Sequence, residues 1–126
     1  LVNLIKELKK KFKISNEKIL GHSDIAPLRK IDPGVHFPWK RIHKNSLGIW
    51  ANDRSDTSKL SSNDYDNFLK NLKKIGYPFI ELNSKNNKND LVINSFHRHH
   101  LPRLVNKTPN KSSLLKCIDI LDLKKH

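Results

Sequence analysis

Apolar residues recur at helical spacing at the beginning of the chain. The apolar positions are Leu1, Leu4, Ile5, Leu8 and Phe12. They lie three or four residues apart and lysines occupy the opposite face, so the pattern predicts an amphipathic helix that ends near Lys13.

Three more stripes of this kind lie in the second half of the chain. The first consists of Tyr65, Phe68, Leu69, Leu72 and Ile75. The second consists of Leu91, Val92, Ser95, Phe96 and His99. The third consists of Leu114, Leu115, Ile118 and Leu121. Each predicts one helix, and together they predict a three-helix module.

Capping residues place the ends of these helices. Ser62 or Asn63 is the expected N-cap of the first, and Gly76 is its expected C-terminal stop. The second should end before Pro102, and the expected N-cap of the third is Ser112 or Ser113.

The segment between the first helix and the module has a different pattern. The β-prone run "KILG" predicts a short buried strand with His22 at its end, followed by an irregular loop from 23 to 36. "FPWKRIHKN" then predicts one or two helical turns, with Pro38 near their start. A single strand cannot be buried alone, so we expect an α/β fold, a mixed sheet with helices, truncated at its N-terminal side and followed by the small three-helix module.

A polar, irregular stretch divides the chain near residue 60. We therefore predict a partial domain over residues 1–48, a linker over 49–62 and a helical module over 63–126. Trp50 indicates that part of the linker packs against the protein.

Composition narrows the classes of function. The net charge of +13 would attract any polyanion, including nucleic acid or an anionic wall polymer. The lysines are dispersed among asparagines, without the aromatic interleaving of single-strand binders, so we predict no nucleic-acid partner. No apolar run approaches the length of a membrane span, and the lone Cys117 falls in an apolar helical pattern typical of a core.

Three residues between positions 22 and 32 could carry chemistry. A histidine nitrogen and a carboxylate oxygen are both good zinc ligands, which makes His22 and Asp32 candidate metal ligands. Lys30 lies two residues before Asp32, where extended backbone would put both side chains on one face. A cation there could stabilise the oxyanion that develops during amide hydrolysis. By spacing alone, a His and an Asp on a loop are more often residues that hydrogen-bond within the loop than metal ligands.

The stretch "GHSDIAPLRKIDPGVHFPW" resembles the signature segment of the zinc-dependent N-acetylmuramoyl-L-alanine amidases of the type-2 amidase family, relatives of the peptidoglycan recognition proteins. The resemblance implies that His22 and Asp32 are two of three zinc ligands and that Lys30 stabilises the transition state. It implies packing roles for Phe37 and Trp39.

The second half resembles the peptidoglycan-binding-like helical module of the envelope branch of that family. Its pattern F-x-x-H-x-x-P is met by Phe96, His99 and Pro102. The resemblance implies peptidoglycan or muropeptides as partners. It favours the cell envelope or periplasm of a bacterium over the cytoplasm, and it leaves the oligomeric state open.

The implied reaction is hydrolysis of the amide between N-acetylmuramic acid and L-alanine, in cell-wall degradation or recycling. The family's first zinc ligand, a histidine, and the acidic residue that activates water are expected before Leu1, so only part of the active site would lie in this chain. The alternative is a catalytically inactive remnant that at most binds peptidoglycan.

Other polar residues receive simpler interpretations. In the cluster of His97, His99 and His100 we expect His99 to be a buried framework residue and the other two to be solvated. Asp24 is expected to tie the backbone of the loop.

Overall fold

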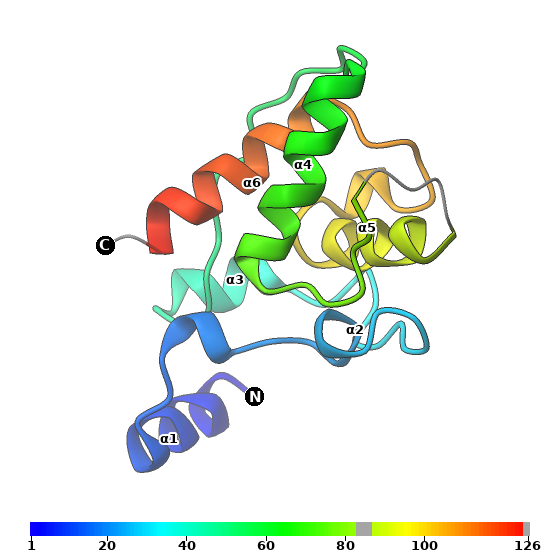
Figure 1. The fold of residues 1–126 in the computed structure, drawn as a ribbon. Helices are drawn as coiled ribbons and strands as arrows, with labels where there is room; N and C mark the ends of the chain where they lie inside the picture. The colour runs from blue at the N-terminus through cyan, green and yellow to red at the C-terminus, as the bar shows by residue number, and fades with distance from the viewer. Residues whose placement is uncertain (83–86, 125–126) are drawn as a thin grey trace.

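The computed structural model describes residues 1–82 and 87–124, and helices make up its regular structure (Figure 1). The elements in chain order are α1 (Val2–Phe12), η1 (Asn16–Lys18), α2 (His22–Ile25), α3 (Trp39–Lys44), α4 (Ser62–Ile75), α5 (Asn87–His100), η2 (Pro102–Leu104) and α6 (Lys111–Lys124). η1 and η2 are short 3₁₀ helices. Helix α4 packs on α6, and α2 packs on α5.

The predicted α/β fold is wrong for the part of the chain that the structure describes. That part contains no strand, and its one β-bridge is the isolated pair Lys59 and Asn110. Ile19 has the extended backbone that its pattern indicates, at φ −90° and ψ 99°. A strand also needs a neighbour for its backbone hydrogen bonds, however, and none of the described residues runs as a strand beside it. His22 therefore begins the short helix α2 rather than ending a strand.

The main hydrophobic core lies where α4, α5 and α6 meet. Its buried residues include Phe68, Leu69, Leu72, Val92, Ile93, Phe96, Leu114, Cys117 and Ile120. All three predicted stripes contribute to it, and the Phe96 ring meets the rings of Phe68 and Tyr77 edge to face. The three predicted helices and the core position of Cys117 are confirmed.

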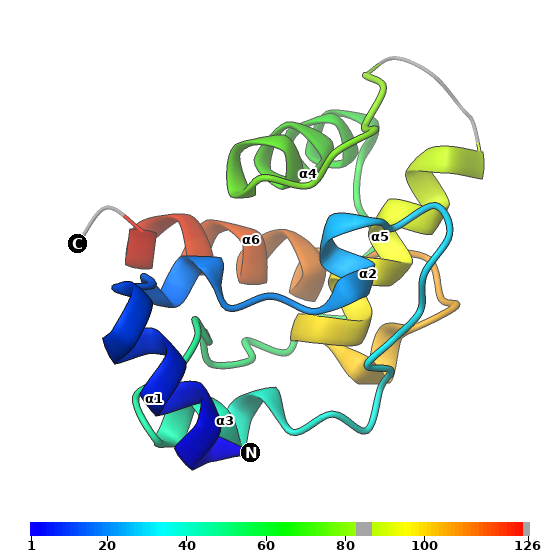
Figure 2. The same cartoon turned by 90° about the horizontal axis from the view of Figure 1, so that it is seen from below.

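Helix α1 is also where its pattern predicts it, but it buries none of its residues. It lies at the edge of the molecule, apart from the α4–α6 core (Figures 1 and 2). The Nζ of Lys9 donates to Oδ1 of Asn16 at 2.8 Å, and that oxygen also accepts from the backbone N–H of Gly48 at 3.1 Å. Polar contacts therefore help to hold the segment after α1 against the end of α3.

The stretch 49–61 runs along α6. Ala51 is buried in the core. The backbone N–H of Asp56 donates to Oγ of Ser112 at 2.7 Å, and Arg54 donates two hydrogen bonds to Asp119, at 2.9 and 2.8 Å. The linker is therefore packed down, although the division into domains stays a prediction.

Lys116 of α6 is a buried cation that sequence reasoning did not anticipate. Its ammonium donates to the backbone carbonyl of Ala51 and lies 4.7 Å from the ring centroid of Trp50. Burial lowers the pKa of Lys116 to about 8. These contacts confirm that Trp50 packs against the protein, as predicted.

Two predicted N-caps are displaced. The N-cap of α4 is Ser61, whose hydroxyl accepts from the N–H of Asp64, and Gly76 ends the helix as expected. At the start of α6, Oδ1 of Asn110 accepts from the N–H of Ser112 at 2.9 Å. Ser112 itself lies buried in the first turn of the helix, and its hydroxyl donates to the backbone carbonyl oxygen of Asp56.

Across residues 1–82 and 87–124, no helix combines the length and apolar content needed to cross a bilayer.

Candidate functional site

The side chains of His22 and Asp32 meet at the surface of the molecule. Nδ1 of His22 and Oδ2 of Asp32 are 3.2 Å apart, and the two side chains are 45% and 64% exposed. The structure therefore brings together the two predicted metal ligands and leaves both open to solvent.

The backbone holds these two residues together. The N–H of Ser23 donates to the carbonyl oxygen of Asp32 at 2.9 Å. Gly21 packs so closely that a Cβ there would lie 2.7 Å from Cδ of Pro33 and 3.2 Å from Cζ2 of Trp39. Because only glycine allows this approach, the G-H pair and the D-P pair of the signature segment are packed as one unit.

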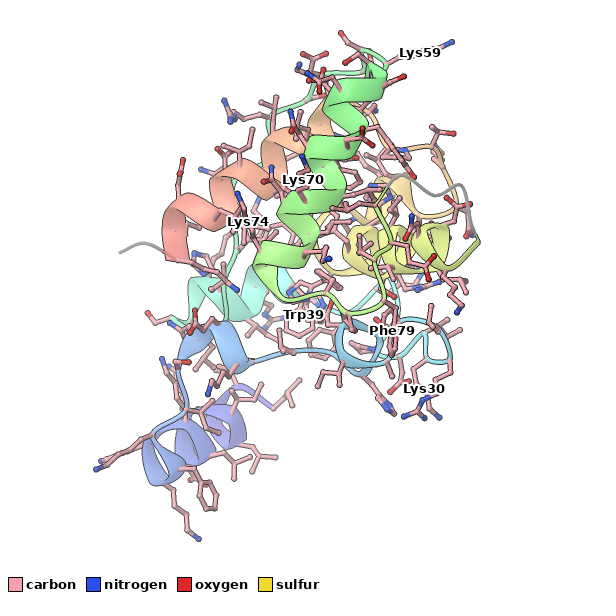
Figure 3. The ribbon with its side chains drawn as sticks, in the orientation of Figure 1. Lys30, Trp39, Lys59, Lys70, Lys74 and Phe79 are labelled. Carbon is pink, nitrogen blue, oxygen red and sulfur yellow. The ribbon has the colours of Figure 1, made fainter. Side chains whose placement is uncertain are left out.

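Lys30 lies in the turn between α2 and Asp32. Its N–H donates to the carbonyl oxygen of Ala26 at 3.0 Å, and its side chain is half-buried. Figure 3 shows Lys30 at the outer edge of the α2 segment, whereas Trp39 points into the body of the molecule. Trp39 is 6% exposed and its ring centroid is 4.7 Å from that of Phe37, so the predicted packing role of this pair is confirmed.

The chemistry of the two facing side chains fits a zinc ion. Two ligands bonded to tetrahedral zinc at 2.0–2.1 Å would lie about 3.3 Å apart, close to the separation of His22 and Asp32. The described residues contain no group of three or more His, Cys, Asp and Glu side chains that could hold a metal ion. Among the described residues, two candidate ligands therefore meet at this place, and their role as ligands stays a prediction.

Asp24 is the centre of a buried network directly beside this pair. Its Oδ2 accepts from the N–H of Gly21 at 2.8 Å and faces Nδ1 of His99 at 2.7 Å. Its Oδ1 accepts from the hydroxyl of Tyr77 at 2.5 Å. Burial raises the pKa of the Tyr77 phenol well above its usual value, and the neighbouring carboxylate adds to the shift, so this hydroxyl stays a donor.

The predicted backbone role of Asp24 is confirmed, but its bonds to Tyr77 and His99 were not foreseen. The two partners lie 53 and 75 residues away in sequence. Local patterns carry no information about contacts at that distance along the chain.

All three histidines near the end of α5 are buried. Their exposures are 0% for His97, 4% for His99 and 6% for His100. The prediction for His99 is confirmed, and the prediction that His97 and His100 are solvated is wrong. Nε2 of His97 is 2.9 Å from Oγ of Ser113, and burial lowers its pKa to about 4.

Trp39, His99 and His100 form a stack of rings. The centroid of His99 is 3.7 Å from that of Trp39 and 3.9 Å from that of His100, with both pairs nearly parallel. The stack joins the signature segment to α5, because Trp39 belongs to that segment and His99 belongs to the helix.

Comparison with curated proteins gives two informative relatives. The chain is 30% identical over 112 residues to the N-acetylmuramoyl-L-alanine amidase AmiD of Escherichia coli K12, an alignment that covers 84% of this chain and 40% of that protein. Over 29 residues it is 59% identical to the 1,6-anhydro-N-acetylmuramyl-L-alanine amidase AmpD of Haemophilus influenzae, covering 23% of this chain and 16% of AmpD. The chain thus spans less than half the length of these relatives. No family model matches it.

Among solved structures, the chain is similar to E. coli AmiD in complex with the substrate anhydro-N-acetylmuramic acid-L-Ala-D-gamma-Glu-L-Lys. The TM-score is 0.83 at 24% identity, over 97% of this chain and 49% of that one. The arrangement of helices found here therefore occurs within a larger amidase.

Proposed function

We propose that this chain belongs to the type-2 N-acetylmuramoyl-L-alanine amidase family, as its similarity to AmiD and AmpD suggests, and that it contributes part of a zinc-dependent active site that hydrolyses the amide between N-acetylmuramic acid and L-alanine. Its share of that site is His22, Asp32 and Lys30. The substrates would be peptidoglycan or the muropeptides released from it.

The observation that carries this proposal is the pairing of His22 with Asp32. The pair is exposed, its separation of 3.2 Å suits a shared metal ion, and it lies in the segment that resembles the family's signature. The pair of Asp24 and His99 is also hydrogen-bonded, but both of its side chains are buried, at 4% and 5% exposed. Exposure is therefore what distinguishes the candidate ligands from this structural pair.

The residues of this chain would have separate tasks. The imidazole of His22 and the carboxylate of Asp32 would hold the ion, and the backbone bond between Ser23 and Asp32 would keep them together. The ammonium of Lys30 would lie beside the carbonyl oxygen of the scissile amide and stabilise the negative charge that develops there.

A bound zinc ion would polarise the amide carbonyl and lower the pKa of its water. A third protein ligand and an acidic general base are also needed, because an open catalytic zinc site has three protein ligands and the attacking water needs a proton acceptor. We propose that both come from the part of the larger amidases that this chain does not span.

An assay of the chain joined to the part of AmiD that it does not span, on muropeptides with and without added Zn²⁺, tests the proposal. We expect zinc-dependent release of peptides that begin with L-alanine, and Lys30→Ala should lower that rate about 100-fold or more, as loss of one oxyanion donor does. Arg29→Ala is the matched control, because it removes an exposed neighbouring cation.

Two outcomes would contradict the proposal. Release that is unchanged by Lys30→Ala would show that this cation has no role. Retention on peptidoglycan without any zinc-dependent release would support the alternative, a remnant that binds the wall without cleaving it.

A further inference from the structure

The α2 turn that carries His22 is anchored to the helical part of the molecule through one carboxylate. Asp24 is buried, with its side chain 4% exposed, and its oxygens are bonded to Gly21, Tyr77 and His99. Gly21 belongs to the signature segment. The other two partners belong to the later part of the chain, Tyr77 after α4 and His99 in α5.

Hydrogen bonds join the residues on the two sides of His22. The N–H of Gly21 donates to the Asp24 carboxylate, and the N–H of Asp24 donates to the carbonyl oxygen of Gly21 at 3.1 Å. The two residues between them are His22 and Ser23, and Ser23 donates to the backbone of Asp32. Any shift of the Asp24 carboxylate would therefore move the His22 backbone relative to Asp32.

Packing of the Trp39 and His99 rings also restricts the position of the α2 turn. Trp39 stacks on His99 and also lies against Gly21, where there is no room for a Cβ. His99 consequently contacts both the carboxylate and the indole that border the α2 turn. Tyr77 adds a buried hydroxyl whose only described hydrogen-bond partner is Asp24.

We propose that Tyr77 and His99 are positioning residues of the site, which act through Asp24 to hold His22 and Asp32 at ligand separation. This inference rests on the proposed function and deepens it. The helical module thereby has a role in the geometry of the active site, in addition to any contact with the wall.

The variant Tyr77→Phe tests this with little disturbance, because it removes the hydroxyl and keeps the ring that packs on Phe96. Ser113→Ala is the matched control. It removes a buried hydroxyl that contacts Nε2 of His97 and does not touch Asp24. Tyr77→Phe loses one side-chain hydrogen bond, whereas Ser113→Ala loses two, to His97 and to the N–H of Asn110, so the control should lower global stability at least as much.

The first readout is hydrogen exchange of the Ser23 amide, which reports on the backbone bond between α2 and Asp32. We expect Tyr77→Phe to accelerate it about fivefold to tenfold more than Ser113→Ala does. Equal exchange in the two variants, or exchange in Tyr77→Phe as slow as in the unmodified chain, would overturn the inference. This measurement needs no metal.

The second readout is the affinity for Zn²⁺. It is measured from the change in the NMR signals of the His22 ring as Zn²⁺ is added. Loss of a residue that orients a ligand weakens metal binding by about tenfold or more, so Tyr77→Phe and His99→Gln should show this while Ser113→Ala should not. If the unmodified chain shows no saturable response at His22, the proposed function fails. If it responds and both variants bind equally well, the positioning role fails instead.

Discussion

Helix α1 and the α4–α6 core have the same kind of sequence pattern and opposite environments. The core residue Phe96 is 0% exposed, whereas Phe12 of α1 is 62% exposed and Leu4 is 55% exposed. Periodicity alone predicts both regions as amphipathic helices. Only the structure shows that one stripe is packed and the other is not, so α1 should contribute little to the stability of the fold.

Substitution in the core should have the largest effect. Phe96→Ala removes a ring that meets Phe68 and Tyr77, and it leaves a cavity between α4, α5 and α6. The free energy of unfolding should fall by about 3–5 kcal/mol. Urea unfolding followed by circular dichroism measures it. A loss below about 1 kcal/mol would show that the core is not packed as described.

Lowering the pH should reduce the stability of the same core. Burial lowers the pKa of His97 to about 4, from an ordinary value of 6.5, and it lowers that of His100 well below the ordinary value, with His99, Lys116 and Lys124 adding to the shift. The unfolded chain therefore binds more protons than the folded chain below pH 6.5, and stability falls as the pH falls.

For His97 alone this loss should reach about 3 kcal/mol by pH 4. Urea unfolding at a series of pH values between 7.5 and 4 measures it. His97→Gln should flatten the profile, because glutamine does not titrate in that range. A variant profile as steep as that of the unmodified chain would contradict the assignment.

The start of α4 offers a smaller test. Ser61 accepts from the N–H of Asp64 at 3.1 Å, so Ser61→Ala should cost about 1 kcal/mol of stability. Ser62, one of the two N-caps that the sequence indicated, lies inside the helix and is exposed. Ser62→Ala is therefore the control, with little or no loss in the same unfolding experiment. A larger loss for Ser62→Ala would restore the original assignment.

The smallest effect is expected in α1. Phe12 is mostly exposed and its ring lies 5.4 Å from the ammonium of Lys11. Phe12→Ala should change the free energy of unfolding by no more than about 0.5 kcal/mol. A loss comparable to that of Phe96→Ala would show that α1 is packed in solution, and the contrast between the two regions would disappear.

The sequence was sufficient for features that depend on local pattern. The four amphipathic helices and the stop at Gly76 follow from spacing and capping chemistry. The N-cap of α4 was predicted at Ser62 or Asn63 and is Ser61, because neighbouring serines and asparagines can all cap a helix. The strand predicted over "KILG" failed because a strand depends on a partner, which a local pattern does not reveal.

The candidate site was foreseen only in part. The resemblance placed His22 and Asp32 together, and the structure brings them within 3.2 Å. The burial of His97 and His100 was missed, because polar residue types ordinarily indicate exposure. The link from Asp24 to His99 depends on how two distant segments pack, and no property of either segment alone predicts it.

Zinc binding tests the central claim, that His22 and Asp32 are metal ligands on a segment held by the helical core. The experiment is calorimetric titration of Zn²⁺ into the chain and into His22→Ala, with His36→Ala as the control for loss of an exposed imidazole. Binding should weaken about tenfold or more in His22→Ala and stay unchanged in His36→Ala. Equal binding by His22→Ala and the unmodified chain would contradict the claim.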